Sequence, residues 1–279
     1  MTHARSIVAL AGAITASTAI AGGGPMNLVI DGRIIVGYGE AFGFEGNEFS
    51  SEQQEPIFAG LEFMTWSEFA TGDGFLSGGG GNGFASQTST MNASAISGSG
   101  STNASASNDG TLDFASGLGS SELQATFEIT RPTRFRLDAA LEATGEGRAW
   151  ARVSDGISPF PDPHYELSTV LGDDGGTVDF TLPAGQYSFV LRSDVSVTFF
   201  NESGSASGTS SFDGSLETGT GCNGADLNLP EGVLDFSDVA FFIVLFAGDH
   251  PLADFAPPIG VRDFSDVVAF LAEFGAGCP

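Results

Sequence analysis

Hydrophobic and polar residues alternate along most of the chain, from Met26 to about Glu217. A period of two places successive side chains on opposite faces of an extended strand, and Gly, Pro, Asn and Asp separate the runs as turn residues do. The pattern therefore predicts successive antiparallel strands. Because the chain has 279 residues, of which 41% are hydrophobic and 40 are glycine, we expect a mainly β protein, an antiparallel β-sandwich of jelly-roll-like type.

Two pairs of strands stand out, each joined by a short turn. The first pair is joined by Arg131-Pro132-Thr133, and its alternate apolar residues are expected to share one buried face. These residues are Phe127, Ile129, Phe135, Leu137, Ala139 and Leu141. The second pair is joined by Pro183-Ala184-Gly185, where proline followed by glycine is strong turn chemistry. It carries Val178, Phe180, Leu182, Tyr187, Phe189 and Leu191, and we interpret it as a hairpin.

Residues 77–121 are rich in Gly, Ser, Ala and Asn, with serine or asparagine at every second position from Ser97 to Ser107. A flexible linker is one interpretation. The other is a long strand whose small inner side chains lie under phenylalanines of the opposite sheet. We favour the strand, because a linker does not need strict alternation. A second stretch of small residues, 204–211, is expected to close the sandwich.

The N-terminus has the features of a secretory signal peptide. Arg5 precedes an apolar stretch over 7–20, and Ala19-Ile20-Ala21 supplies small residues at a cleavage site. We predict a signal peptide over 1–21 and a secreted or cell-surface location. No later apolar run reaches the length of a membrane span, since the longest, from Val239 to Ala247, is about half of it.

The formal charge of −26 arises from 35 acidic residues against 9 basic ones, all arginine. Such a polyanion lacks the basic surface that binds phosphates, which argues against a nucleic-acid partner. Cations are the ligands it attracts, calcium first among them. For most of these carboxylates, solubility is the simpler explanation.

An internal repeat follows Cys222. Residues 232–239 recur as residues 260–267, both reading Gly-Val-x-Asp-Phe-Ser-Asp-Val. A repeat this regular indicates duplicated structure, here an acidic loop that opens into a helix. The serine of each copy is a candidate helix cap. The first helix is apolar nearly all round, so we expect its twin, the sandwich or a partner to cover it. Amphipathic spacing in the second helix groups Phe264, Val267, Val268, Leu271 and Phe274.

Cys222 and Cys278 flank the repeat and are the two cysteines of the chain. In an exported protein with no other thiol we expect them to form a disulfide, the alternative being two free thiols. Closing a loop of about 57 residues would stabilise the module by roughly 4 kcal/mol in the chain-entropy model.

The repeat and the terminal Gly277-Cys278-Pro279 give residues 222–279 a resemblance to the GC-type dockerin domain. That family implies two half EF-hands, each a calcium loop followed by one helix, and docking to a cohesin-like receptor that attaches the protein to a surface or complex. The domains are then a sandwich over 22–217, a linker over 218–221 and the dockerin-like module over 222–279.

The resemblance also implies site residues. The calcium ligands of loop one would be Asp226, Asn228, Glu231, the carbonyl of Val233, Asp235 and Asp238, and those of loop two Asp254, Asp263 and Asp266. Loop two has Ala256 at a ligand position and Pro257-Pro258 in its middle, so calcium is expected in loop one before loop two. The residues themselves leave a second interpretation open, in which these aspartates cap the helices.

The receptor contacts implied by the resemblance are Phe236, Ser237, Phe264 and Ser265. Exposed phenylalanines would be suitable anchors for a partner. The alternative is that they are buried between the two helices, and the spacing around Phe264 favours burial.

No catalytic arrangement is evident in the sequence. His164 and His250 stand alone in expected loops, and no Gly-x-Ser-x-Gly motif occurs. Seven glutamates between Glu40 and Glu68 supply carboxylates, but their mutual distances are not a property of the sequence. We therefore predict a non-catalytic exported protein.

Three possibilities for the sandwich remain open. By analogy of fold, recognition of extracellular carbohydrate is a plausible task. A secreted glycan-active hydrolase is the second possibility, which an acidic pair in a cleft lined by Trp66 or Trp150 would favour. A structural matrix protein without a small-molecule ligand is the third.

Overall fold

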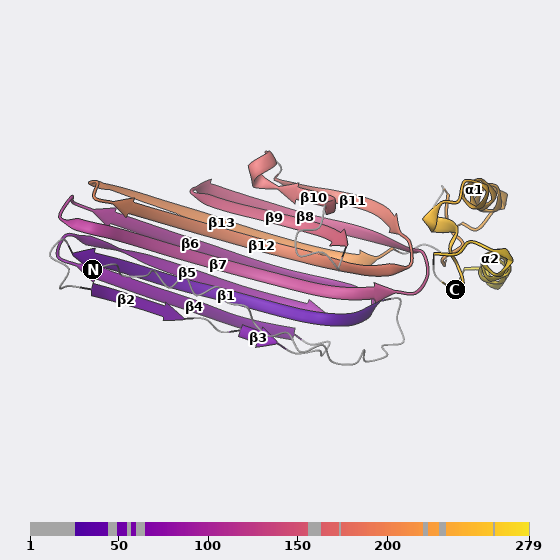
Figure 1. Ribbon diagram of the computed structural model, residues 1–279, viewed down its shortest axis with the longest axis horizontal. Helices are drawn as coiled ribbons and strands as arrows, with labels where there is room; N and C mark the ends of the chain where they lie inside the picture. Colours follow the sequence, from indigo (N-terminus) through magenta and orange to yellow (C-terminus); the bar gives the residue numbers. More distant parts are fainter. Residues whose placement is uncertain are drawn as a thin grey trace.

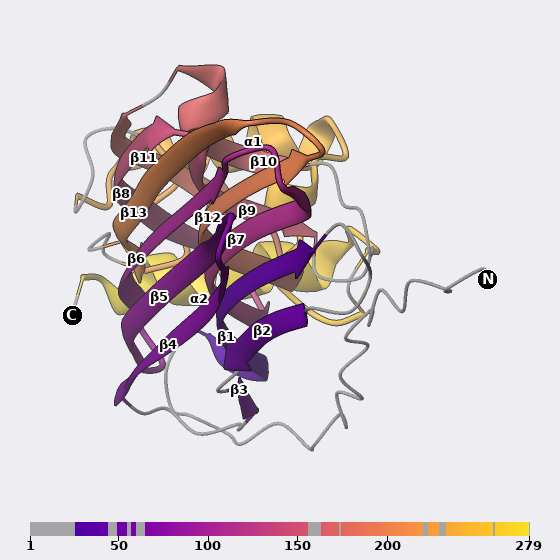
Figure 2. The ribbon, with the colours of Figure 1, turned by 90° about the vertical axis from the view of Figure 1, so that its left-hand side faces the viewer.

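A computed structural model describes residues 26–43, 49–54, 57–59, 65–155, 163–172, 174–219, 223–228, 233–258 and 260–278. The predicted signal peptide and Cys222 lie outside these residues. The described chain is mainly β, in two antiparallel sheets, with two helices near the C-terminus. The predicted fold class is therefore confirmed. Figure 1 shows long strands running side by side and both helices at one end, and Figure 2 shows the strands in oblique, twisted layers.

The described strands divide between a sheet of seven, called sheet A, and a sheet of six, called sheet B. Sheet A contains β1 (Asn27–Gly43), β2 (Phe49–Gln54), β3 (Ile57–Ala59), β7 (Leu112–Ile129), β9 (Gly147–Asp155), β10 (Pro163–Ser168) and β12 (Gly185–Phe200). Sheet B contains β4 (Thr65–Leu76), β5 (Gly79–Met91), β6 (Ala95–Asn108), β8 (Thr133–Gly145), β11 (Gly175–Leu182) and β13 (Gly204–Thr218). A 3-10 turn, η1 (Thr169–Leu171), follows β10.

The strand order is β10-β9-β12-β7-β1-β2 in sheet A, with β3 also paired to β1, and β11-β8-β13-β6-β5-β4 in sheet B. The small-residue stretch over 204–211 opens β13, which lies at the centre of sheet B between β8 and β6. In the chain it is the last described strand before the helical module.

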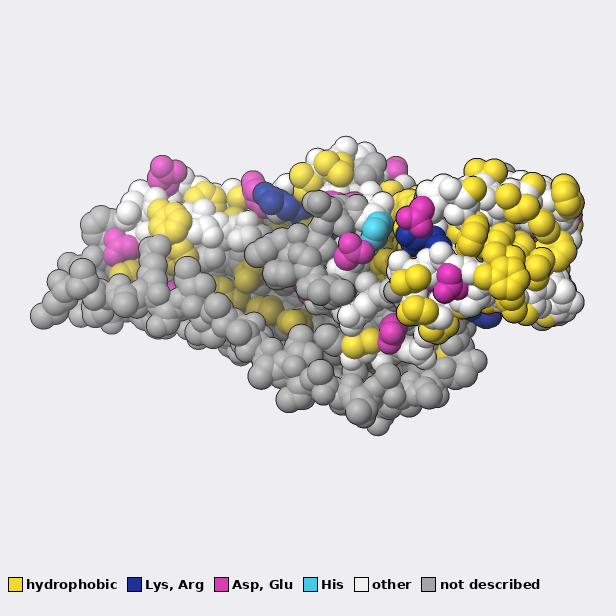
Figure 3. All heavy atoms as spheres, turned by 45° about the vertical axis from the view of Figure 1, so that its right-hand side comes forward, with side chains coloured by type: hydrophobic (Ala, Val, Ile, Leu, Met, Phe, Trp, Pro, Cys, Tyr) yellow, Lys and Arg dark blue, Asp and Glu magenta, His cyan; other side chains and the backbone are white. Residues whose placement is uncertain are grey.

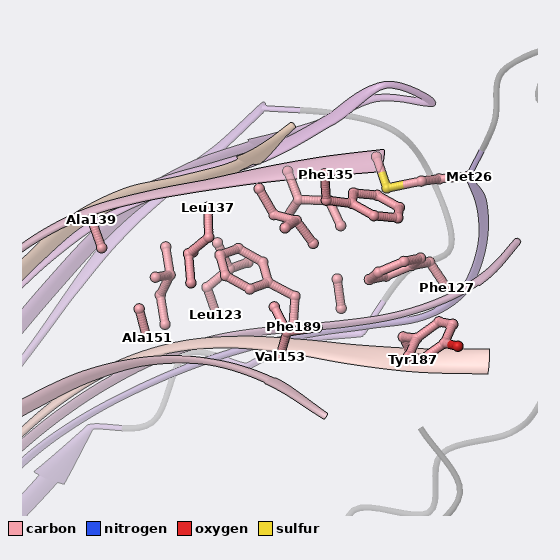
Figure 4. Packing of buried hydrophobic residues seen from close by; sticks show 14 of the residues in the cluster. Met26, Leu123, Phe127, Phe135, Leu137, Ala139, Ala151, Val153, Tyr187 and Phe189 are labelled. Carbon is pink, nitrogen blue, oxygen red and sulfur yellow. The ribbon is translucent and has the colours of Figure 1, made fainter. Parts of the chain in front are cut away.

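All four predicted strands exist, but consecutive strands do not pair, so neither turn forms a hairpin. β7 lies in sheet A and β8 in sheet B, and the Pro183 turn likewise carries the chain from β11 in sheet B to β12 in sheet A. Their alternate apolar residues therefore meet across the interior instead of side by side. Figure 4 shows Phe127 and Phe135 approaching from opposite sheets, with ring centroids 5.6 Å apart. The expectation of a hairpin was wrong because a turn between sheets needs the same alternation and turn residues.

The stretch over 77–121 is not one long strand but contains β5, β6 and the start of β7. Its alternating segment, 97–107, lies in β6, so the strand interpretation is confirmed there against the linker. Its inner residues Ala104 and Ala106 belong to a cluster against which Phe199 of the opposite sheet packs, as expected. The backbones of β5 and β6 also approach glycines of β7: a Cβ added to Gly119 would lie 2.4 Å from the carbonyl oxygen of Phe84 and 2.8 Å from that of Asn103. Backbone thus approaches backbone between the sheets here, which is closer than the usual spacing of about 10 Å allows.

The core of the described sandwich has three parts. Large side chains such as Phe127 and Phe135 fill one region, and alanines and two valines dominate a second cluster that includes Ala104 and Val195. A small third cluster contains Ile35, Ala70 and Ala85. The aromatic region carries most of the apolar burial, and hence most of the hydrophobic stabilisation of the sandwich.

The C-terminal residues form a separate small core around two helices, α1 (Phe236–Ala247) and α2 (Phe264–Ala276), joined in part by a 3-10 turn, η2 (Pro251–Ala253). Phe242 and Phe270, which are equivalent positions of the repeat, stack with centroids 4.0 Å apart and planes at 6°. The predicted duplication is therefore present as a pair of helices that pack through equivalent residues.

Candidate functional site

Both helices begin with the same capping box. Asp235 is the N-cap of α1 and accepts hydrogen bonds from the backbone N–H and the hydroxyl of Ser237, and Asp263 does the same for Ser265 in α2. Hydrogen bonds from these serines lower the pKa of both aspartates. The expectation that the serines themselves cap the helices was wrong, since the aspartate two positions earlier does so.

A second aspartate of each copy, Asp238 in the first and Asp266 in the second, is fully buried. Asp266 accepts three backbone hydrogen bonds, from Phe255 and Ala256 at 2.7 and 2.8 Å and from Asp263 at 2.7 Å. Asp238 accepts the equivalent three from Leu227, Asn228 and Asp235. Each of these carboxylates therefore ties its preceding loop to the first turn of its helix.

Calcium is bound by six to eight oxygens. No group of three acidic, histidine or cysteine side chains is gathered within the described residues, and several of the predicted ligands accept hydrogen bonds from the protein itself. In loop two, Asp266 is engaged by backbone N–H groups and Asp263 by Ser265. Asp254 is 3% exposed and accepts from the N–H of Gly260, which leaves its buried Oδ1 without a hydrogen bond.

The remaining predicted ligands of loop one are placed as follows. Asp226 is buried at 6% exposure, Asn228 is partly buried and Val233 is 47% exposed, while Glu231 lies outside the described residues. Calcium binding in either loop stays a prediction.

The predicted receptor contacts are on the surface. Phe236 is 79% exposed and Phe264 is 75% exposed, so the expectation that Phe264 is buried was wrong. The face that α2 buries contains Phe270, with Val267 and Phe274 packed against it, whereas Val268 and Leu271 point outward. The predicted amphipathic group in α2 thus mixed two different faces.

The two helices share an exposed apolar surface, here called the helix-pair face. It contains Phe236, Ile243 and Val244 of α1, and Phe264, Val268 and Leu271 of α2, each at least half exposed. Phe236 with Phe264, and Ile243 with Leu271, are equivalent positions of the repeat. Figure 3 shows hydrophobic side chains gathered over this end of the molecule. Exposed apolar surface of this kind is typical of an interaction site.

Cys278 follows α2 at the end of the described chain and is disulfide-bonded. Its predicted partner, Cys222, lies outside the described residues, so the pairing of the two stays a prediction.

A hollow of about 1100 Å³ lies on the outer face of sheet A. Its floor is a row of directly paired residues on neighbouring strands, Ile34 of β1, Glu122 of β7, Arg192 of β12, Trp150 of β9 and Ser168 of β10. A second row, about 7 Å along the strands, contains Gln124, Val190, Arg152 and Glu166. Val170 and Leu171 of η1 form an apolar edge.

Arg192 organises the middle of the hollow. Its guanidinium donates to Glu122 and Asp194, both at 2.8 Å, and lies 5.1 Å from the ring centroid of Trp150. Burial opposes the charge of Arg192, but Asp194 and Glu122 outweigh it and raise the pKa of the guanidinium. Ser120 also donates to Asp194, at 2.6 Å. Glu122 and Asp194 are thus both engaged by one cation.

The arginines beside Trp150 on β9 differ from Arg192. Neither Arg148 nor Arg152 forms an ion pair within the described part of the chain, and the Nε of Arg152 is buried without a hydrogen-bond partner. The sequence pattern indicates Trp150 only as a possible cleft residue and singles out neither arginine. Three of the nine basic residues lie in the hollow, but they come from strands far apart in the chain.

The histidines and glutamates that were considered as catalytic or metal-binding residues do not form a site among the described residues. His164 pairs with Asp155 at 2.8 Å on an exposed surface, and the ring of His250 accepts from the backbone N–H of Leu252. Of the seven glutamates between Glu40 and Glu68, four lie outside the described residues. No helix among the described residues is long and apolar enough to cross a membrane.

Comparison with known proteins adds no assignment, because neither a protein-family model nor a curated protein matches this chain.

Proposed function

We propose that the chain is a non-catalytic exported protein, held at a surface or in an extracellular complex by docking of its helix-pair face to a cohesin-like receptor. One observation carries the proposal. Equivalent residues of a duplicated motif, Phe236 and Phe264, are 79% and 75% exposed although phenylalanine is normally buried. The dockerin resemblance supplies the class of receptor, and the N-terminal signal-like segment supplies export.

The chemistry of the helix-pair face supports protein contact. Phenylalanines surrounded by aliphatic side chains resemble the aromatic anchors that dominate protein interfaces. The capping boxes hold both phenylalanines at the first turn of their helices, which fixes them before a partner arrives.

The test is retention of tagged full-length protein on the cells of the bacterium of origin. We expect the double variant Phe236→Asp and Phe264→Asp to move from the cell-associated fraction to the medium, because a buried unpaired carboxylate at each anchor opposes docking. Circular dichroism checks that the helices remain folded.

The matched control is the double variant Phe69→Asp and Phe75→Asp. These phenylalanines of β4 are 62% and 53% exposed on the sandwich. The control should stay cell-associated. Equal retention of both double variants, or equal loss of both, would contradict docking through the helix-pair face.

A further inference from the structure

We propose that the hollow on sheet A binds a neutral polysaccharide chain, with Trp150 and the side chains around Arg192 as its binding residues. This site is separate from the helix-pair face and does not depend on docking. Its residues come from β1, β7, β9, β10, β12 and η1, so the rigid sheet holds them in place.

The lining has the mixed character that a sugar ring requires. A pyranose presents a face of C–H groups and an edge of hydroxyl groups, so it needs apolar surface and hydrogen-bonding groups side by side. Trp150 is partly exposed, and Val170 and Leu171 are 64% and 70% exposed at the edge of the hollow. Between them lie planar donors and acceptors of fixed direction, which suit hydroxyl groups.

Arg192 is held in a single orientation by its neighbours. Glu122 and Asp194 both form ion pairs with its guanidinium, which lies 5.1 Å from the centroid of the Trp150 ring. Because these groups are already fixed, a ligand that meets them loses little additional side-chain entropy.

Arg152 supplies an unsatisfied donor. Its Nε is buried and has no hydrogen-bond partner within the described chain. A buried donor without an acceptor costs free energy, and a ligand hydroxyl placed there would remove that cost. Arg148, four residues earlier on the same outer face, is likewise without an ion pair in the described residues.

Charge favours a neutral ligand over an acidic one. The lining holds three arginines and four acidic residues, Arg148, Arg152, Arg192, Glu122, Glu146, Glu166 and Asp194. The hollow is therefore nearly balanced, while the whole chain carries −26 and repels polyanions.

Tryptophan fluorescence offers a direct test, because Trp66 and Trp150 are the two tryptophans of the chain. In the full chain with Trp66→Phe, the emission reports on Trp150. The probes are cellohexaose, xylohexaose and mannohexaose, with hexagalacturonate as the acidic counterpart. We expect saturable change with at least one neutral hexasaccharide and binding at least about tenfold weaker for hexagalacturonate.

Variants identify the site by calorimetric titration with the neutral probe that binds. Trp150→Ala and Arg152→Gln should each weaken binding at least about tenfold, whereas Phe75→Ala, on the other sheet, should leave it unchanged. Unfolding curves check that each variant is folded. The proposal is overturned if no neutral probe gives a saturable change, if hexagalacturonate binds as tightly, or if both hollow variants bind like the unsubstituted chain.

Discussion

Asp238 and Asp266 show how much a single side chain contributes in a small module. Each is fully buried and accepts three backbone hydrogen bonds from its own loop and helix start. A buried carboxylate is stable only when its oxygens are satisfied, and here the loop backbone satisfies them. Each loop is therefore tied to its helix by one of its own acids.

Replacing Asp266 by alanine should destabilise the helix pair by roughly 2–4 kcal/mol, since three buried or partly buried N–H groups lose their acceptor. The measurement is urea unfolding of the full chain, followed by the helical signal in far-ultraviolet circular dichroism. The variant Glu166→Ala, an exposed acid on β10, is the control and should change little.

A chelator decides between the two roles of Asp266. If Asp266 acts only by accepting hydrogen bonds from the loop and the helix start, the loss of unfolding free energy is the same in EDTA and in calcium. A loss that appears only in calcium would show that Asp266 acts as a metal ligand, as the dockerin resemblance implies.

At the scale of the element, glycines set how closely the sheets approach. A Cβ built on Gly83 of β5 would lie 1.8 Å from the carbonyl oxygen of Leu118 on β7, and one on Gly117 would lie 2.2 Å from that of Asn82. No side chain fits between backbones at this distance. These glycines are required for packing, although their backbone dihedral angles are ordinary for a strand.

The variant Gly83→Ala should therefore lose about 3 kcal/mol or more of unfolding free energy, because backbone must shift to admit one methyl group. Gly32→Ala is a matched control in a strand of sheet A, where the nearest atom to the new Cβ is 3.9 Å away. We expect a change below about 1 kcal/mol there. Similar losses for both glycines in urea unfolding would show that strand flexibility, and not sheet contact, explains the effect.

At the scale of the whole molecule, the sandwich and the helix pair have separate cores. Phe127 and Phe135 belong to the first, and Phe242 and Phe270 to the second. One described ion pair, from Arg131 at the β7–β8 turn to Glu273 of α2 at 2.7 Å, joins the two parts, and the side chain of Arg131 is 48% exposed. An exposed pair of this kind contributes less than about 1 kcal/mol.

Calorimetric unfolding of the full chain should accordingly show two transitions, since neither core depends on the other. Arg131→Ala should leave both midpoints nearly unchanged. A thiol reductant should lower the transition of the helix pair alone, because Cys278 is disulfide-bonded in that part. A single transition that moves as one in the reductant would instead show that the sandwich and the helices unfold together.

The sequence by itself determined the elements and their repetition. Alternation in residues 97–107 was sufficient to predict β6, because period two is a local property of an extended chain. The repeat predicted twin helices, and the aspartates at their starts were recognised as possible caps. Local spacing decides these features, since each depends on residues within about one turn or one strand.

Tertiary structure decided what those elements contact. The same alternation serves a hairpin and a crossing between sheets, so only the packed core shows that β7 and β8 face each other. Each helix carries apolar residues on more than one face. Which of them are buried depends on where the other helix packs, and this packing buries Phe270 and leaves Phe264 exposed. The hollow joins Glu122, Arg192 and Trp150 by strand pairing between distant segments, a long-range register that no local pattern encodes.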